Sequence, residues 1–392
     1  MKKLRKIDLW IVIPYILLLG IGIVMVYSAS FYNALMVGAS TTTYLFKQSL
    51  FAVVGLISCF FVFILKAKVF RSRRLVKWLL SLTLLALIFV LILGVIKPST
   101  RINGAAAWIP LGFFSLQPLE IAKVVLILYL SMVLTNKQER ILAHQGLREV
   151  VSEVLPPMLV VIAIVFLLIC QPDYGGAMVI VLITLILLAS STIPGKYILR
   201  LSISLVVGLA LMIGAIFMVN PTFITKRYQY QRVLAMLHPF QMEKTAGAQL
   251  VNSFYAISNG GIFGVGLGNG IQKRGYLPEP HTDFIIAVIS EELGLVGVIV
   301  VLGLLAIIVI RIIQIGIRAK KNYDSLVCYG VATMFMTQII LNVGGSIGLV
   351  PLTGVTLPFL SYGGSSMLIL SIALGIVLNL DATRKFENMK KR

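Results

Sequence analysis

The sequence has little charge for its length. Only 12% of its 392 residues are charged and 59% are hydrophobic, whereas a soluble globular chain is about a quarter charged and about half apolar. So little polar surface cannot cover a water-soluble particle, which excludes a soluble enzyme, a disordered protein and a fibre. The composition predicts an integral membrane protein with many spans.

Cysteine, histidine and acidic residues are also scarce. The three cysteines lie inside apolar runs, which indicates small buried side chains and no disulfide framework. No group of Cys and His has zinc spacing, so no metal ligands are predicted from the pattern. The 34 basic residues exceed the 14 acidic ones by 20, but they are scattered between apolar runs. Because they form no basic domain, a nucleic-acid partner is excluded.

Ten apolar runs predict the transmembrane helices. Lipid offers the backbone no hydrogen-bond partners, so each run is expected to be a helix, and runs this continuous do not fit the alternating strands of a β-barrel. The runs lie near residues 9–28, 45–65, 77–96, 119–135, 154–170, 176–193, 197–219, 284–310, 325–345 and 361–380. The first run has about 19 apolar residues, more than the roughly 7–15 of a signal peptide, so we expect an uncleaved span. Residues 1–392 are then one all-α polytopic membrane domain with short basic tails at 1–8 and 381–392.

The distribution of Lys and Arg predicts the orientation. With the N-terminus inside, the cytoplasmic segments carry 24 basic residues, the outer segments carry 9, and Lys123 lies within a span. Cytoplasmic loops are enriched in basic residues, so both termini are expected in the cytoplasm. Acids on that side, among them Asp8, Asp324 and Asp381, are expected to be solvated.

A long outer loop at about 220–283 separates the seventh and eighth runs. Long loops without regular structure tend to be functional. This loop has an apolar stretch at 253–257 followed by six glycines between Gly260 and Gly270, a pattern that indicates amphipathic helices on the membrane with Gly-rich turns. The glycines resemble a nucleotide loop only superficially, because no Gly-Lys-Ser/Thr follows them.

Two sets of titratable residues are candidates for chemistry. Glu120 and Lys123 share one helix face at membrane depth, where ionisable groups are costly: they form either a neutralised structural pair or a Lys, positioned by Glu120, that meets an anionic substrate. Asp283 begins the eighth run, where partial desolvation would raise its basicity and suit a general base. The alternative is that Thr282 or Asp283 caps the helix. Glu279, on a Pro-bounded turn, is the next acidic candidate.

Other outer-side residues could bind a sugar or a phosphate. Trp108 is either an interfacial aromatic residue or a platform for a sugar. Arg101 and Arg232 are either solvated or are cations for a pyrophosphate. Ser361 and Ser365 open the last span, where a helix N-terminus with hydroxyls could receive phosphate, or where the helix merely starts.

A set of motifs, in order along nearly the whole chain, resembles the SEDS family (shape, elongation, division and sporulation), whose members include FtsW, RodA and SpoVE. The motifs are Asn103-Gly104-Ala105 with Trp108, Gln117-Pro118-x-Glu120-x-x-Lys123, Gln171-Pro172-Asp173-x-Gly175, Gly264-x-Gly266-x-Gly268-Asn269, Leu277-Pro278-Glu279-x-His281-Thr282-Asp283-Phe284, Glu291-Glu292-x-Gly294 and Pro358-Phe359-x-Ser361-Tyr362-Gly363-Gly364-Ser365-Ser366. The stretches 275–281 and 354–358 look more like the division-type FtsW than the elongation-type RodA.

The resemblance implies an activity that composition cannot reveal. It implies a SEDS-type fold and an inverting glycosyltransferase that polymerises lipid II at the outer face of the cytoplasmic membrane, with undecaprenyl pyrophosphate leaving. It places the family's essential Asp on Asp283, its loop tryptophan on Trp108 and its Glu–Lys pair on Glu120 and Lys123. It also implies a class B penicillin-binding transpeptidase and other divisome proteins as partners, and a location at the division septum.

Other functions and a cofactor stay open at this stage. A divalent cation, Mg²⁺ or Mn²⁺, is a candidate cofactor. A lipid-linked precursor flippase is the main alternative function, and a scaffold that only recruits a transpeptidase is the third. A flippase needs polar groups through both leaflets, whereas the charged candidates here cluster on the outer side, which favours chemistry there.

Overall fold

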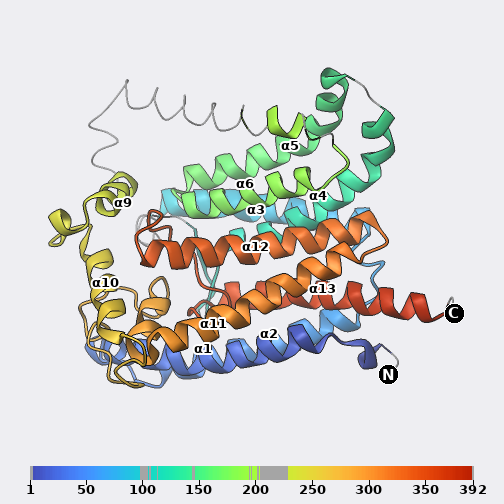
Figure 1. The fold of residues 1–392 in the computed structure, drawn as a ribbon. Helices are drawn as coiled ribbons and strands as arrows, with labels where there is room; N and C mark the ends of the chain where they lie inside the picture. The colour runs from blue at the N-terminus through green and yellow to red at the C-terminus, as the bar shows by residue number, and fades with distance from the viewer. Residues whose placement is uncertain are drawn as a thin grey trace, which may run out of the picture.

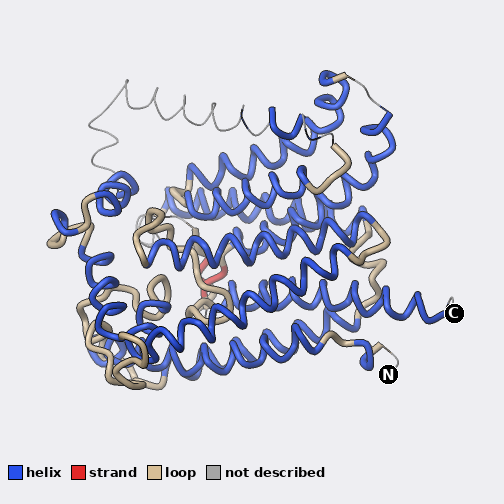
Figure 2. The backbone as a smooth tube through the Cα atoms, viewed as in Figure 1, coloured by secondary structure: helices blue, strands red, loops and turns tan. Residues whose placement is uncertain are grey.

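A computed structural model describes residues 3–97, 105, 107–112, 114–143, 146–193, 195, 197–200, 203 and 228–390. This part of the chain is almost wholly helical, with one small hairpin of strands (Figures 1 and 2). The predicted all-α membrane class is therefore confirmed. The elements are α1 (Leu9–Met36), α2 (Thr43–Ile64), α3 (Arg73–Ile96), β1 (Ile109–Pro110), β2 (Ser115–Leu116), α4 (Pro118–Ala143), α5 (Leu147–Cys170), α6 (Tyr174–Ala189), α9 (Tyr228–Leu237), α10 (Ala248–Gly260), α11 (Ile285–Ile317), α12 (Asn322–Ser346) and α13 (Gly364–Lys390), with single 3₁₀ turns at Leu4–Lys6 and Phe240–Met242.

Eight of the described helices are long and apolar enough to span a membrane. They are α1, α2, α3, α4, α5, α11, α12 and α13. The 16-residue α6 is shorter and also apolar. These helices coincide with the expected runs, apart from the run at 197–219, which falls mainly outside the described residues. The prediction that these apolar runs form helices holds because hydropathy over about 20 residues is what lipid selects.

The helices form a bundle with two distinct ends. Both termini lie at one end, here called the terminal end, and α9, α10 and the segment 261–284 lie at the other, here called the loop end (Figure 1). The helix α13 packs on α2, α1 packs on α11, and α12 packs on both α4 and α6. The spans α4, α12 and α13 are the most buried, so they form the centre, whereas α3 and α5 are mostly exposed and form the periphery.

Buried ion pairs fix the terminal end. Asp8 caps α1 and accepts hydrogen bonds from Arg311 of α11, at 2.9 Å, and from Lys385 of α13, at 3.5 Å. Lys385 and Arg384 both lie 2.5 Å from carboxylate oxygens of Asp381. Asp8 and Asp381 are 4% and 1% exposed, so the expectation that these acids are solvated is wrong. Both carboxylates are paired with basic side chains, which is the usual condition for burying a charge.

The long helix α11 is broken near its start. Gly294 has φ +67° and ψ −168°, which is not helical. The segment 261–266 runs alongside the break: the Val265 N–H donates to Glu291 O at 2.9 Å, and the Leu295 N–H donates to Gly261 O at 3.0 Å. Irregular backbone at this depth is tolerated because another segment of the chain satisfies its polar groups.

Candidate functional site

A cavity of about 770 Å³ opens at the loop end of the bundle. Its wall combines the start of α2, the described residues around the β1–β2 hairpin, the turn before α6, α9, the segment 279–283, and the segments 350–356 and 362–364. These parts are far apart in the sequence and come together because the connections at this end converge over the central helices. The predicted residues that line the cavity are Trp108, Arg232, Glu279 and Asp283.

Asp283 lies in this wall just before α11. Its backbone carbonyl accepts a hydrogen bond from Asn342 Nδ2 at 3.0 Å, and the same amide nitrogen reaches Val355 O at 2.9 Å. Asn342 of α12 therefore ties the Asp283 backbone to the opposite segment of the wall. The N-cap position of α11 is Phe284, with no side chain capping it. The carboxylate of Asp283 is thus not used as a helix cap.

The surroundings of Asp283 favour its neutral form. The pKa of Asp283 is raised from 3.8 to about 6: burial raises it most, the Arg232 charge lowers it, and the nearby Glu279 carboxylate raises it. Burial penalises a charged carboxylate because it removes the water that would solvate it. A carboxylate with a pKa near neutrality is a stronger base than an ordinary Asp and is still mostly charged at pH 7.

Glu279 is held on a strained turn beside Asp283. Its φ is +52°, a left-handed conformation that non-glycine residues rarely adopt. The Thr282 hydroxyl donates to Glu279 Oε2 at 3.0 Å, and the Thr282 N–H donates to Glu279 O at 3.2 Å. Thr282 therefore orients Glu279, which in turn faces the same cavity as Asp283.

Arg232 comes to the cavity from α9. Its Nη1 donates to Leu352 O at 2.7 Å, which joins α9 to the segment 350–356. Its positive charge lowers the pKa of Asp283. Arg232 is therefore placed to act on a negative group bound next to Asp283.

His281 and two tyrosines form the side of the cavity beside Asp283. The His281 ring lies 4.8 Å from the Tyr44 ring and 5.6 Å from the Tyr362 ring, centroid to centroid. Burial lowers the pKa of His281 because it penalises the charged ring, so the neutral imidazole is favoured.

Ser361 and Ser365 are not in the cavity wall. The Ser361 hydroxyl donates to Thr282 O at 2.6 Å and accepts from the Leu357 N–H at 2.9 Å. It thus braces the backbone directly before Asp283. Ser365 is 1% exposed and lies behind the wall in α13. A substrate-binding role for either serine stays a prediction.

Trp108 and Asp173 lie on another part of the wall. Trp108 directly precedes β1, which pairs with β2 in a short hairpin. Asp173 caps α6 through a 2.9 Å hydrogen bond from the Gly176 N–H and accepts a 3.2 Å hydrogen bond from Gln117 Nε2. Burial raises the pKa of Asp173. The indole and this carboxylate thus belong to the same cavity as Asp283.

Glu120 and Lys123 form a buried ion pair behind this part of the wall. Lys123 Nζ lies 2.8 Å from both carboxylate oxygens of Glu120, and the residues are 2% and 5% exposed. Neither lines the cavity. Lys123 lowers the pKa of Asp173 and Glu120 raises it, so the pair influences the cavity through Asp173. The geometry shows the structural pair directly, and contact with substrate stays a prediction.

Sequence reasoning did not single out Lys47. It lies in α2 and lines the cavity. The only signal in the sequence is that it is a lone basic residue at the start of an outer-side apolar run. Arg101, the other predicted cation, lies outside the described residues.

The cavity wall contains groups suited to three tasks. Asp283 can accept a proton, Arg232 and Lys47 can attract a phosphate or pyrophosphate, and Trp108 offers an apolar face to a sugar ring. Among the described residues, no group of three or more His, Cys, Asp or Glu side chains could hold a metal ion. The described residues therefore do not form a cation site built from protein ligands alone.

Known proteins resemble this chain over its full length. The model of a family described as cell cycle protein, covering FtsW, RodA and SpoVE, matches residues 9–386. The chain is 37% identical to a protein named probable peptidoglycan glycosyltransferase FtsW from Bacillus subtilis, over 100% of this chain and 94% of that protein. It is 35% identical to the stage V sporulation protein E of the same organism, over 97% of this chain and 98% of that protein.

Two solved structures have a similar fold. One belongs to a structure described as the coordination of polymerization and crosslinking by a peptidoglycan synthase complex. It superposes with a TM-score of 0.75 at 29% identity and covers 96% of this chain and 98% of that one. The other is the rod shape determining protein RodA of Thermus thermophilus, with a TM-score of 0.67 at 28% identity, over 96% of this chain and 97% of that one.

Proposed function

This chain belongs to the FtsW/RodA/SpoVE family of cell cycle proteins, and we propose that it is the peptidoglycan glycosyltransferase that polymerises lipid II during cell division. The observation that carries the proposal is the cavity that places Asp283, Arg232 and Trp108 in one wall. A base, a cation and an apolar platform are the groups that sugar transfer from a lipid pyrophosphate needs.

The reaction joins an acceptor sugar hydroxyl to the anomeric carbon of the donor. Asp283 accepts the hydroxyl proton while the acceptor oxygen forms a bond to that carbon from the face opposite the leaving group. The bond between the anomeric carbon and the pyrophosphate oxygen breaks, and undecaprenyl pyrophosphate leaves with the electron pair. The attack from the opposite face inverts the anomeric centre and gives a β-1,4 linkage.

The cations of the cavity act on the leaving group. Negative charge accumulates on the pyrophosphate as the bond breaks, and a guanidinium can bind two of its oxygens at once. Arg232 is held by its hydrogen bond to Leu352 O, so it stabilises that charge without first having to be ordered. Lys47 adds a second positive charge in the same wall.

A divalent cation would have to be shared with the substrate. Mg²⁺ in such sites is typically held by one or two carboxylates together with substrate phosphates. Glu279 and Asp173 are the carboxylates of the wall, besides Asp283, that could contribute. The proton transfer assigned to Asp283 does not depend on such an ion.

The test of the function is direct. The purified protein in lipid nanodiscs receives fluorescent lipid II, and the glycan products are separated by length on a gel. Long glycan strands from the wild-type chain and none from Asp283→Asn support the proposal. Translocation of lipid II between leaflets without any polymer would support a flippase instead.

We infer that a separate protein crosslinks the glycan, since the described residues form a membrane domain. We infer that the partner is a class B penicillin-binding transpeptidase of the divisome, whose single span would bind a lipid-facing surface on α11 and α12. The similarity to a peptidoglycan synthase complex supports this. Isolation of the tagged protein from native membranes, followed by labelling with a fluorescent penicillin, should reveal the transpeptidase.

The same proposal places the loop end at the outer face of the cytoplasmic membrane and the termini in the cytoplasm. The bias of basic residues toward the terminal end supports this orientation. The division septum is the expected location. A fluorescent fusion that stays evenly distributed over dividing cells would contradict it.

A further inference from the structure

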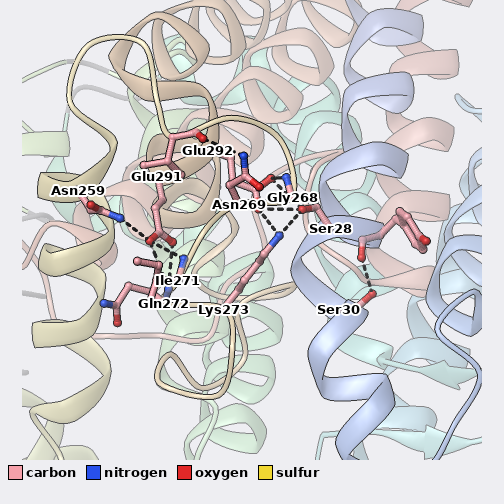
Figure 3. A network of polar contacts seen from close by, with 12 residues as sticks. Ser28, Ser30, Asn259, Gly268, Asn269, Ile271, Gln272, Lys273, Glu291 and Glu292 are labelled. Carbon is pink, nitrogen blue, oxygen red and sulfur yellow. Dashed lines mark hydrogen bonds and ion pairs between the residues drawn. The ribbon is translucent and has the colours of Figure 1, made fainter.

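Two buried carboxylates at the loop end do not face the cavity. Glu291 and Glu292 of α11 are both 0% exposed, and neither lines the cavity wall. Figure 3 shows that they point in different directions, Glu291 toward the segment at 271–272 and Glu292 toward α1. Buried charges are costly unless paired and hydrogen-bonded, so their contacts indicate what they are for.

Glu292 joins three parts of the chain. Its carboxylate accepts hydrogen bonds from the Ser28 hydroxyl of α1 at 2.8 Å and from the Gly268 N–H at 3.1 Å, and it pairs with Lys273 (Figure 3). Lys273 Nζ also donates to Ser28 Oγ at 2.7 Å. We call Ser28, Lys273 and Glu292 the clasp. It ties the segment 268–273 to both α1 and α11.

Glu291 holds the same segment by its backbone. Glu291 Oε1 accepts from the Ile271 N–H at 2.8 Å and from Asn259 Nδ2 at 3.0 Å, and Oε2 accepts from the Gln272 N–H at 3.2 Å. Hydrogen bonds to a carboxylate are stronger than neutral ones. The two neighbouring acids therefore hold 268–273 from both sides.

The break in α11 turns its first part into a separate short helix. Residues 285–293 lie before the non-helical Gly294. Asp283 stands two residues before this short helix, and Glu291 and Glu292 stand at its other end. A helix of nine residues is about 13 Å long. Movement of the end that carries the two acids would therefore shift Asp283 in the cavity.

We propose that the clasp is a positioning device for the base: it fixes the short helix 285–293 so that Asp283 is held at the acceptor hydroxyl. The proposal rests on the proposed function. The clasp does not touch the cavity, so Ser28, Lys273 and Glu292 are positioning residues. A misplacement of a reacting group by about 1 Å can cost roughly a hundredfold in rate.

Stability of the fold alone does not explain the clasp. Replacing a buried ion pair by apolar residues of similar size is often neutral, whereas removing only one partner is strongly destabilising. A variant that removes both charges therefore distinguishes a role in stability from a role in positioning. Removing both charges should preserve the fold while it loosens the short helix.

The experiment compares variants in the lipid II polymerisation assay at several lipid II concentrations. Lys273→Met together with Glu292→Gln removes both charges. Ser28→Ala removes one hydrogen bond and leaves no charge unpaired. Lys244→Met, an exposed lysine of the same loop, is the matched control, and Asp283→Asn is the reference for loss of the base. Thermal unfolding of each purified variant reports the fold.

We expect the double variant to lose at least tenfold in maximal rate, while the half-saturating lipid II concentration changes less than threefold and the unfolding temperature stays near that of the control. Ser28→Ala should lose a smaller part of the maximal rate. A folded double variant with the maximal rate of wild type, or a loss confined to the half-saturating concentration, overturns the proposal. If the double variant does not fold, an unchanged maximal rate in Ser28→Ala overturns the proposal. An active Asp283→Asn would reject the assigned base and with it the premise of the proposal, whereas an inactive Asp283→Asn beside a fully active double variant would reject the clasp alone.

Discussion

Lowering the pH should slow lipid II polymerisation at a pH where an ordinary aspartate would still be charged. The proposed base works only in its deprotonated form, so the rate follows the charged fraction of Asp283. Burial raises the pKa of Asp283 to about 6. Because the pKa is raised, the active form is present above this value and is lost as the pH falls through it.

The size of the effect follows from that pKa. With a pKa of about 6, about nine tenths of Asp283 is charged at pH 7 and about one tenth at pH 5, so the rate should fall roughly tenfold between these values. With the ordinary value of 3.8, the charged fraction would change by less than about a tenth over the same range. The two cases are easily told apart.

A second variant tests the cause of the shift. The positive charge of Arg232 lowers the pKa of Asp283. Its removal in Arg232→Met should move the acid limb of the pH profile to higher pH as well as reduce the rate. Lys244→Met, which changes an exposed lysine outside the cavity, should leave the limb in place.

The assay is the initial rate of glycan formation from fluorescent lipid II in nanodiscs, measured from pH 4.5 to 8 with each sample returned to pH 7 to show that activity recovers. Asp283→Asn should lose about a hundredfold to ten-thousandfold at pH 7. A wild-type rate that is flat between pH 7 and pH 5, or an Asp283→Asn variant within threefold of wild type, would refute the reasoning.

Three further predictions test other parts of the molecule. Trp108→Ala should raise the half-saturating lipid II concentration roughly three- to tenfold, because an aromatic contact is lost; an unchanged value in the concentration series would place the sugar elsewhere. Lys123→Met should lower the free energy of unfolding by about 3–5 kcal/mol by leaving Glu120 buried and unpaired, and Lys123→Met with Glu120→Gln should recover most of it in thermal unfolding. In a chain whose native cysteines are replaced, a cysteine at Lys244 should react with an impermeant thiol reagent in intact cells and one at Arg73 should not; the reverse pattern would reject the proposed orientation.

The sequence predicts the spans well because hydropathy is a local property. Each of the described long helices starts or ends within a few residues of an apolar run on at least one side. Their polar ends are harder to predict: α4 continues to Ala143 and α13 to Lys390, well past the apolar runs. A helix can continue beyond the hydrocarbon region because water and charged side chains satisfy its ends there.

The break in α11 could not be read from hydropathy. The run at 284–310 is uniformly apolar apart from the two acids, and a glycine within it does not by itself announce a break. The break depends on a segment more than 25 residues away. Gly261 O and Ile262 O accept hydrogen bonds from the N–H groups of Leu295 and Val296, and the N–H groups of Val265 and Gly266 donate to Glu291 O and Glu292 O. The close approach also explains Gly264 itself, since a Cβ there would lie 2.2 Å from Glu292 O.

The candidate site shows the same limit. Asp283 and Trp108 could be singled out because an acid or an indole is conspicuous beside apolar runs. Lys47 could not, since a lone lysine at the start of a span looks like any interfacial residue. What brings Lys47, Trp108 and Asp283 into one wall is the packing of α2, α13 and α12, which no local pattern encodes.

The loop end can hold a site of irregular backbone because other parts of the chain satisfy its polar groups. A chain that spans lipid can leave the helical conformation only where protein satisfies the freed backbone groups, and the segment 261–273 does this for the start of α11. The same segment carries Lys273, whose pairing with Glu292 satisfies the charge that the break leaves buried. The glycines and the charges of this region therefore solve one physical problem, which is to hold Asp283 in the cavity wall at the start of a helix that breaks at Gly294.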